Sequence, residues 1–423
     1  MKIEKFENSF LSESYSVATM ENGLKIYVLE KPNYSSAYAV FGTKYGSVNV
    51  KFRTDKDSDF IEVPAGIAHF LEHKLFESEE GDAFEKFART GAYANAYTSF
   101  DRTGYLFSCT DEFKENLTHL LSFVSSPYFT KETVDKEQGI IGQEIRMYDD
   151  SPDWKVFFNL LTSVYHNNPV RTDIAGTVES IAKITPELLY DCYNTFYHPS
   201  NMYLCVVGNV KTDEVLKIAE ECIKTEGKQV IENFEPFEPK EVKEAYFEQK
   251  LDVAKPLFAL GFKQDAAVAA TPKARIATEL LLEVLAGHSS PLYNRLEEEK
   301  IINPEFSFEH FTGSTYSVIM FTGESDNPKL VAQKIKQEVA RLKKEGIDPE
   351  AFARARRKGF GQTVMMFNNV EGLCSALCEC AIRGEDLFDF EEIYANTTAE
   401  DLMAVLETMK EEYTSLSVIQ PKE

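Results

Sequence analysis

The sequence predicts an α+β fold with two similar domains, each a mainly antiparallel sheet with helices packed on one face. A chain of 423 residues is longer than one ordinary hydrophobic core organises. Its 43% hydrophobic content, which includes 31 Phe and 20 Tyr, supplies enough apolar surface for globular packing and argues against disorder. Hairpins of strands separated by runs of helices recur in both halves, which is typical of α+β domains.

The first half starts with two strand-like runs, "GLKIYVLE" at 23–30 and "AYAVFGTKYG" at 37–46, joined by a Pro-Asn turn signal. A helix follows, and we expect Pro64 in its first turn, where a missing N–H is tolerated. Period-two patterning then predicts a hairpin of "YANAYTSF" at 93–100 with "TGYLFSC" at 103–109. The other elements expected in this half are helices at 114–124, 131–149, 185–197 and 212–224 and a buried strand at 202–208.

Residues 225–243 are charged, interrupted by prolines and poor in periodicity, so we interpret them as a linker. The linker separates a first domain, residues 1–224, from a second domain, residues 244–423. The second half repeats the order of elements, although hardly any residues repeat. Its elements are strands at 245–253 and 255–262, a helix at 274–286, a hairpin of 304–311 with 315–323, helices at 328–345 and 348–368, and a final strand at 414–420.

Charge and hydropathy exclude several classes of partner. Lys and Arg number 45 against 69 Asp and Glu, a formal net charge of -24, and such a field repels nucleic acid. The N-terminal "MKIEKFENSFLSESYSV" lacks the apolar core of a signal peptide, and no apolar run is long enough to span a bilayer. We therefore expect neither a nucleic-acid nor a membrane partner, and a cytoplasmic location.

The seven cysteines are odd in number and show no disulfide-framework spacing, which fits reduced thiols in a cytosol. Cys374, Cys378 and Cys380 leave two interpretations open. They could form a second metal site, or they could be small apolar residues, since Cys374 and Cys378 share one helical face.

The stretch "GIAHFLEHKLF" at 66–76 places His69 and His73 four residues apart, with Glu72 beside them. In a helix, positions i and i+4 share a face and i+3 lies next to them. Two imidazoles at that spacing can bind one tetrahedral ion, and Glu72 can then reach water at that ion without being a ligand. The alternative is a solvated helix face.

A catalytic zinc usually takes a third protein ligand, and the best candidate region is "VDKEQGIIGQEIRMYDD" at 134–150. Burying ionised carboxylates there would be costly unless a cation or strong hydrogen bonds compensate, and a zinc ion is such a cation. The alternative is a helix rotated so that both glutamates are solvated. The stripe that we expect to face the core, at helical spacing, consists of Glu137, Ile140, Ile141, Glu144, Met147 and Tyr148.

His69-x-x-Glu72-His73 reads as the inverted zinc motif of the inverzincins, and the pair Glu137 and Glu144 follows it. With "ANAYTSFDRTGY" and "FYHPSNMYLCVVGNV", these residues resemble the pitrilysin, insulin-degrading enzyme and mitochondrial processing peptidase family of zinc metallopeptidases. The resemblance extends over about residues 20–210 and is looser in the second half. It implies a zinc endopeptidase whose two α+β domains form half of a clamshell around a cavity.

The resemblance also implies roles for single residues. One Zn²⁺ per chain would be held by His69, His73 and Glu144. Glu72 would be the general base, which accepts a proton from the attacking water and delivers it to the leaving amine.

Three further residues obtain roles from the same resemblance. Glu137 would have a supporting catalytic role beside the ligand histidines. Asn95 and Ala96 would belong to the edge strand that pairs with the backbone of an extended peptide substrate. A simple hairpin position for Asn95 and a surface charge for Glu137 are the alternatives.

The sequence departs from the family in its second half, where relatives usually carry an Arg–Tyr pair that holds the substrate carbonyl and the developing oxyanion. Alignment of "SSPLYNRLEEEK" puts Glu297 at the Arg position and Pro304 at the Tyr position, while Arg295 and Tyr293 lie nearby in the wrong order. Loss of oxyanion donors should lower the rate by about 100-fold or more. We therefore expect a heterodimer in which a zinc-free homologous subunit supplies the Arg–Tyr pair, or else a homodimer.

The expected function is hydrolysis of peptides or extended protein segments inside an enclosed cavity. Two other classes of function stay open. A catalytically silent scaffold subunit of a larger peptidase-like assembly would usually have lost zinc-site residues, which are intact here. A metal-binding protein without hydrolysis would have no need for Glu72.

Overall fold

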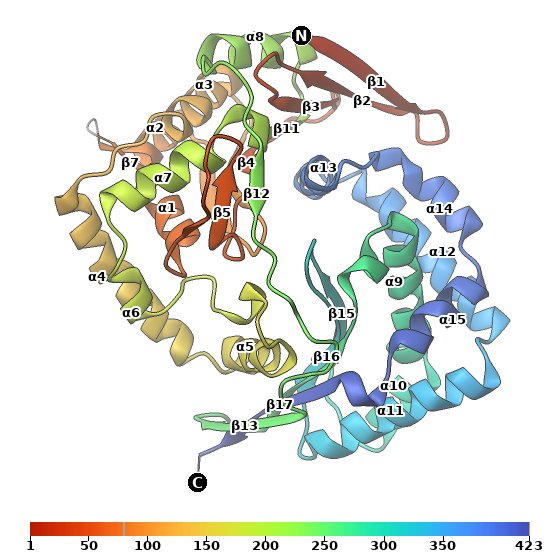
Figure 1. Cartoon of the computed structure of the whole chain (residues 1–423). Helices are drawn as coiled ribbons and strands as arrows, with labels where there is room; N and C mark the ends of the chain where they lie inside the picture. Colours follow the sequence, from red (N-terminus) through yellow and green to blue (C-terminus); the bar gives the residue numbers. More distant parts are fainter. Residues whose placement is uncertain (79–80, 423) are drawn as a thin grey trace. The chain divides into compact units, whose positions relative to one another are not determined.

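The computed structural model describes residues 1–78 and 81–422, and these form two compact units (Figure 1). Unit 1 consists of Met1–Ile145, Asp173–Phe234 and Val364–Asp389, and unit 2 of Arg146–Thr172, Glu235–Thr363 and Phe390–Glu423. The predicted ranges 1–224, 225–243 and 244–423 follow the order of the chain. Each compact unit instead includes a segment from the other half of the sequence.

Unit 1 is built on a seven-stranded sheet of order β1-β2-β3-β11-β4-β10-β9, antiparallel except for the pair β3 and β11. Its strands are β1 (Lys2–Asn8), β2 (Glu13–Thr19), β3 (Lys25–Glu30), β4 (Ala37–Thr43), β9 (Tyr93–Thr98), β10 (Thr103–Cys109) and β11 (Met202–Gly208). The hairpin of β1 and β2 was not predicted, because β1 is charged and mostly exposed and carries little hydrophobic signal. A smaller sheet contains β5 (Lys51–Thr54), β6 (Ile61–Glu62) and β12 (Ile231–Asn233), and β7 (Glu77–Ser78) pairs with β8 (Gly81–Asp82).

Unit 2 contains a five-stranded sheet of order β13-β17-β14-β16-β15, with a parallel pair β13 and β17. This order and these directions match β3-β11-β4-β10-β9 of unit 1 strand for strand. The strand order therefore confirms the two similar α+β domains predicted from the repeated order of elements. The strands are β13 (Tyr246–Leu251), β14 (Leu257–Lys263), β15 (Ser307–Thr312), β16 (Ser317–Glu324) and β17 (Thr414–Pro421).

Helices cover both faces of the central strands, whereas the sequence predicted helices on one face. Every residue of β4, β11 and β14 is buried, so neither face of these strands is exposed. In unit 1, α3 and α8 pack on the sheet, and so does α13 from the second half of the chain. In unit 2, α5 from the first half packs on β14 and β17. The two halves thus exchange one helix each, and the exchanged helices contact equivalent strands.

The helices of the structure have the following bounds. Those in the first half are α1 (Ile67–Leu75), α2 (Ala83–Thr90), α3 (Phe113–Val124), α4 (Lys131–Asp149), α5 (Pro152–Val164), α6 (Val178–Ile181), α7 (Pro186–Phe196) and α8 (Thr212–Cys222). Those in the second half are α9 (Pro272–Ala286), α10 (Pro291–Glu298), α11 (Pro328–Glu345), α12 (Pro349–Met366), α13 (Val370–Arg383), α14 (Phe390–Asn396) and α15 (Ala399–Thr408).

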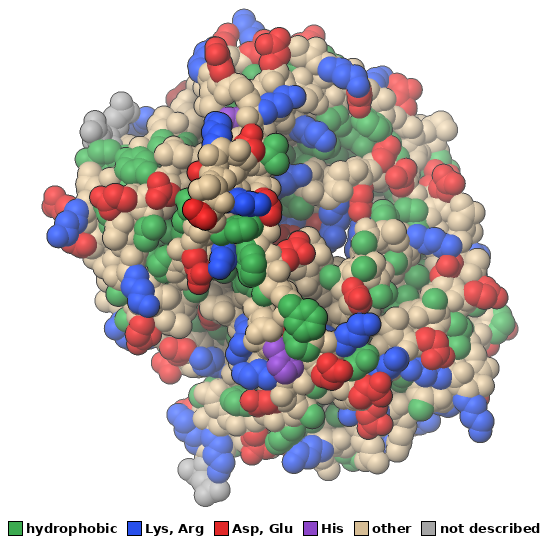
Figure 2. All heavy atoms as spheres, viewed as in Figure 1, with side chains coloured by type: hydrophobic (Ala, Val, Ile, Leu, Met, Phe, Trp, Pro, Cys, Tyr) green, Lys and Arg blue, Asp and Glu red, His purple; other side chains and the backbone are tan. Residues whose placement is uncertain are grey.

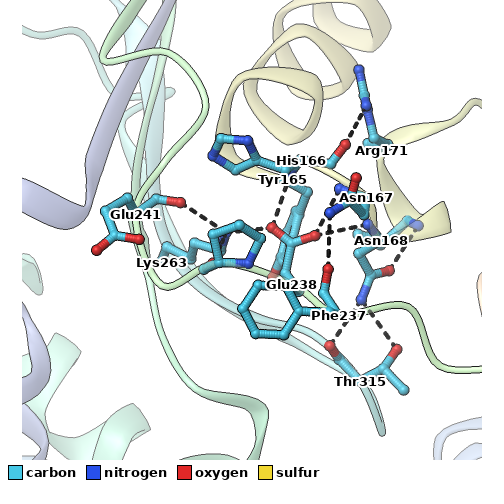
Figure 3. Close-up of polar contacts among 12 residues, drawn as sticks. Tyr165, His166, Asn167, Asn168, Arg171, Phe237, Glu238, Glu241, Lys263 and Thr315 are labelled. Carbon is cyan, nitrogen blue, oxygen red and sulfur yellow. Dashed lines mark hydrogen bonds and ion pairs between the residues drawn. The ribbon is translucent and has the colours of Figure 1, made fainter.

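The segment predicted as a linker is held by specific contacts at both ends. On unit 1, β12 pairs with β5, and the Phe234 N–H donates to the Lys51 carbonyl at 2.8 Å. On unit 2, the Glu238 carboxylate accepts the backbone N–H groups of residues 166–168 at 2.8–2.9 Å (Figure 3). The buried Lys263 ammonium donates to Glu238 at 2.6 Å and to the carbonyls of Pro239 and Glu241. We call this group of contacts the Glu238 clamp.

Candidate metal centre

The start of α1 is fixed by close backbone packing. Gly66 precedes the helix with φ of +91°, and a Cβ atom there would lie 2.4 Å from the Ala175 carbonyl oxygen. Only glycine fits this conformation and this contact without strain. Pro64, which was predicted in the first turn, lies before the helix, which begins at Ile67.

The structure brings His69, His73 and Glu144 together, from α1 and α4 of unit 1. The Nε2 atom of His69 lies 3.6 Å from Glu144 Oε1, and the Nε2 atom of His73 lies 3.5 Å from Glu144 Oε2. The three potential ligand atoms all lie within 4.8 Å of one another. Two residues at i and i+4 on one helix and a carboxylate from a second helix therefore converge on one point.

These separations fit a shared tetrahedral ion better than direct hydrogen bonds. Distances of 3.5 and 3.6 Å exceed the usual range for an N–H···O bond. Zn–N and Zn–O bonds near 2.1 Å with tetrahedral angles place neighbouring ligand atoms about 3.4 Å apart. Two imidazoles and one carboxylate are also a ligand set that zinc commonly takes in catalytic sites. The residues present thus fit a zinc ion.

Glu137 orients one of the two imidazoles. His73 Nδ1 lies 3.0 Å from Glu137 Oε1, so an Nδ1–H group that donates to this carboxylate leaves the Nε2 lone pair facing Glu144. Glu137 is buried at 8% exposure rather than being a surface charge. Burial would raise the pKa of Glu137, but the hydrogen bond from His73 and the charge of His73 lower it overall. Burial would lower the pKa of His73, but Glu137, Glu72 and Glu144 raise it overall.

His69 differs from His73 in its surroundings. Burial, together with the charge of His73, lowers the pKa of His69 to about 4, so this imidazole is neutral near pH 7 and offers a lone pair. Its Nδ1 atom is buried and has no hydrogen-bond partner among the described residues. A neutral, buried imidazole is the form in which histidine binds a metal.

Glu72 is buried beside the three ligand candidates and contacts an unpredicted residue. Thr98 Oγ1 donates to Glu72 Oε2 at 2.6 Å. Burial raises the pKa of Glu72 overall, and the hydrogen bond from Thr98 offsets only part of this rise. The sequence reasoning missed Thr98, and period-two spacing from Ala96 was the signal that could have indicated it.

The face of α4 differs from the predicted stripe. Ile140 and Met147, which we expected in the core, are 46% and 62% exposed. The buried line of α4 keeps Glu137 and Ile141 of the predicted stripe and continues through Ile145. Glu144 lies at the margin of this line, half-buried, which lets its carboxylate reach the imidazoles while remaining accessible.

Asn95 and Ala96 lie on β9, which is an edge strand of the large sheet of unit 1. Asn95 is exposed, and its side chain accepts the Ala96 N–H at 2.9 Å and donates to the Tyr93 hydroxyl at 3.2 Å. β9 pairs with β10 on one side, so its other side is the one to which an extended chain could add.

The departures in the second half are visible in unit 2. Arg295 forms an ion pair with the buried Glu338 at 2.8 Å, and Tyr293 is buried at 5% exposure. The Arg295 guanidinium is thus held by Glu338 although its side chain is 54% exposed, and Tyr293 is part of the packing around α10. Glu297 and Pro304, at the family's Arg and Tyr positions, are exposed and supply neither a guanidinium nor a phenol.

The cysteines do not form a second metal site among residues 1–78 and 81–422, where the His69, His73 and Glu144 cluster is the one group able to hold a metal ion. Cys374, Cys378 and Cys380 are buried on α13 as free thiols.

Within residues 1–78 and 81–422, we find no helix that combines the length and the apolar character needed to cross a membrane.

Comparisons with known proteins identify the family of the chain. The family model described as insulinase (peptidase family M16) matches residues 62–178, and the model described as peptidase M16 inactive domain matches residues 183–358. The zinc protease YmfH of Bacillus subtilis is 41% identical over 414 residues, 96% of each chain. The crystal structure of an M16-like peptidase from Alicyclobacillus acidocaldarius superposes with a TM-score of 0.93 at 36% identity, over 99% of this chain and 100% of that one. Pitrilysin has the same fold at 16% identity and a TM-score of 0.76, over 99% of this chain and 46% of pitrilysin.

Proposed function

The chain belongs to peptidase family M16, and from this premise we propose that it is a zinc-dependent endopeptidase for peptides or extended protein segments. The family includes zinc proteases, so a metallopeptidase is the class of enzyme to which the chain is assigned. The observation that carries the proposal is the convergence of His69 Nε2, His73 Nε2 and a Glu144 carboxylate oxygen beside the buried Glu72.

His69, His73 and Glu144 would hold one Zn²⁺ per chain. Bound there, Zn²⁺ supplies Lewis-acid chemistry that acidifies water and polarises a carbonyl group. The hydrogen bond between His73 and Glu137 keeps one imidazole in the tautomer that binding requires.

Glu72 would act as the general base and acid. Its raised pKa suits a carboxylate that accepts a proton from water and then returns it to the leaving amine. Glu72 Oε1 accepts no hydrogen bond from the described residues and is available for that proton.

The free side of β9 would bind the substrate backbone. Main-chain hydrogen bonds to an edge strand hold an extended peptide with little demand on its sequence. Asn95 and Ala96 lie on the same strand as Thr98, which contacts Glu72, so an added peptide strand would run beside the base.

We further propose that activity requires a second subunit. Arg295 is paired with Glu338 and Tyr293 is buried, and no Arg or Tyr stands at the two family positions. A zinc-free homologous subunit would supply the pair, and a homodimer is the alternative. This chain matches 46% of the length of pitrilysin, which supports an assembly of two such chains.

The seven free cysteines support a cytoplasmic location, because thiols persist in a reducing compartment.

Asp and Glu side chains are interspersed with Lys and Arg on the face shown in Figure 2. This face therefore offers no extended basic surface for nucleic acid.

The test is cleavage of a quenched-fluorescent peptide by protein purified from its native cell, with and without a zinc chelator. Glu72→Gln should retain zinc and lose turnover by about 100-fold or more, since a positioned base contributes about 100- to 10,000-fold. His73→Ala should lose both zinc and turnover. Chelator-insensitive cleavage, or unchanged cleavage by Glu72→Gln, contradicts the proposed mechanism.

Co-purification distinguishes the two assemblies. A zinc-free homologue that accompanies the native protein supports the heterodimer, whereas a single polypeptide at twice the chain mass supports the homodimer. Full activity of a strictly monomeric preparation contradicts both.

A further inference from the structure

We infer that Thr98 is a positioning residue, whose hydroxyl on the substrate strand β9 fixes the carboxylate of Glu72 for proton transfer. The inference rests on the proposed function, because it requires Glu72 to act as the base. It is based on hydrogen-bond geometry around three side chains of unit 1.

The Thr98 hydroxyl has one hydrogen to donate. Thr98 Oγ1 lies 2.6 Å from Glu72 Oε2 and 3.4 Å from Thr103 Oγ1. A bond of 2.6 Å has the length typical of a hydroxyl that donates to a carboxylate, whereas 3.4 Å is long for any hydroxyl pair. The hydrogen therefore lies on the line to Glu72.

β-Sheet pairing places Thr103 directly opposite Thr98. Thr103 is fully buried, and its hydroxyl donates to the Tyr45 carbonyl at 2.9 Å. Because its own hydrogen is used there, Thr103 does not compete with Thr98 as a donor to Glu72. Its side chain instead packs beside Thr98 and limits the rotamers open to that residue.

The two oxygens of the Glu72 carboxylate have different surroundings. With Oε2 held by Thr98, rotation about the last bond of the Glu72 side chain is restricted. Oε1, which accepts no hydrogen bond from the described residues, is then the oxygen left to take a proton. A base held in one orientation loses less entropy when it reacts.

Strand β9 links the base to the proposed substrate position. Thr98 lies two residues after Ala96, so the two side chains project from the same face of β9. The strand that would pair with the peptide thus also carries the hydroxyl that holds the base. Glu72 and the bound peptide would share one rigid support.

The experiment compares three variants of the zinc-loaded native assembly. Thr98→Val removes the hydroxyl and keeps the shape, and kcat should fall about 10- to 100-fold, a part of what a positioned base contributes. KM should stay within about two-fold, because the hydroxyl points at Glu72 and not at the peptide strand. Thr98→Ser, which keeps the hydroxyl, should restore kcat to within about three-fold of the original protein.

The matched control is Thr90→Val on α2. Thr90 Oγ1 lies 2.6 Å from Asn116 Oδ1, so this variant removes a hydroxyl contact of equal length away from Glu72. It should leave kcat unchanged and reveal any general effect of losing a partly buried hydroxyl.

Two measurements do not depend on turnover. Zinc content of Thr98→Val should remain one ion per chain. Peptide affinity, measured in the inactive Glu72→Gln background, should be the same with and without Thr98→Val. A loss of zinc or of peptide affinity in Thr98→Val would assign Thr98 a structural role and overturn the inference.

The outcomes separate this inference from the proposed function. If the unaltered assembly cleaves peptide and Thr98→Val matches it in kcat, the inference is wrong and the proposed function stands. If Glu72→Gln retains full activity, the proposed function is wrong and the inference fails with it.

Discussion

The Glu238 clamp allows a test of how strongly the connecting segment is held to unit 2. In Glu238→Ala, three backbone N–H groups and the Lys263 ammonium would lose their shared acceptor. Lys263 is 4% exposed and would keep the carbonyls of Pro239 and Glu241 and the ring of Tyr165, none of which carries a negative charge. Removal of one partner of a buried ion pair costs about 3–5 kcal/mol, because the other charge stays buried.

We expect the lower end of this range, about 3 kcal/mol, because Glu238 is itself 15% exposed and water can partly replace it. At about 2–4 °C per kcal/mol for a folding unit of this size, the Tm of unit 2 should fall by about 6–12 °C. The assay is differential scanning calorimetry of the full chain at neutral pH. Glu235→Ala, an exposed glutamate in the same segment, is the matched control and should change stability by less than about 0.5 kcal/mol.

The same clamp predicts a pH dependence with a defined sign. Burial would raise the pKa of Glu238, but Lys263 and the three N–H groups lower it overall. A carboxyl whose pKa is lowered by folding contributes stability above its unfolded pKa of about 4.3, and loses it as pH falls through the folded pKa. Burial lowers the pKa of Lys263 even though the hydrogen bond and charge of Glu238 raise it. The favourable pH-dependent contribution to stability therefore comes from the Glu238 carboxylate. The Tm difference between the original protein and Glu238→Ala should therefore be largest near neutral pH and shrink below about pH 4. A difference under 2 °C at neutral pH would refute this reasoning.

Three further predictions concern the metal centre, unit 2 and the exchanged helices. Glu137→Ala should weaken zinc binding about 10- to 100-fold in a competition titration with a chelating dye, and unchanged affinity would contradict its role beside the ligand histidines. Arg295→Ala should destabilise unit 2 by only about 1 kcal/mol in urea unfolding, because Arg341 still pairs with the buried Glu338. A change in peptide cleavage with no change in stability would instead indicate a catalytic role for Arg295. A fragment of residues 1–224, which lacks α13, should show no cooperative thermal unfolding by circular dichroism, and a sharp transition would contradict the exchange of helices.

The local part of the metal centre could be predicted from the sequence because it depends only on helix geometry. His69, Glu72 and His73 lie within about one turn of a helix, so their common face follows from the spacing. Glu144 required a second helix, and the resemblance to a known family rather than the spacing selected it. The structure places its carboxylate 3.5–3.6 Å from both imidazoles.

The face of α4 could not be fixed by pattern alone. Glu137 belongs both to the predicted stripe and to the buried line that the structure shows, since a helical period tolerates a rotation of one position. Ile140 and Met147 fit the predicted stripe equally well in sequence, yet both are exposed. Which apolar residues are covered depends on the neighbouring elements, and these are not encoded in the helix itself.

The exchange of α5 and α13 could not be predicted from the sequence, for a related reason. An apolar face predicts that a helix is covered, but it does not say which sheet covers it. The repeated strand order was visible because strands and hairpins are local, whereas the helix on the second face of each sheet comes from the other half of the chain.

This exchange has a consequence for how the metal centre forms. The candidate ligands and the base all come from residues 69–144, and β9 and β10 connect them to β4 and β11. Those two strands are buried on both faces. Helix α13, at Val370–Arg383, packs on both strands and covers one of these two faces. Without α13, a continuous apolar face of the sheet would be exposed, and exposed apolar surface destabilises a fold in proportion to its area. The sheet that supports the centre is therefore completed only after residues far downstream of it have been synthesised, and zinc affinity should depend on a segment that contributes no ligand.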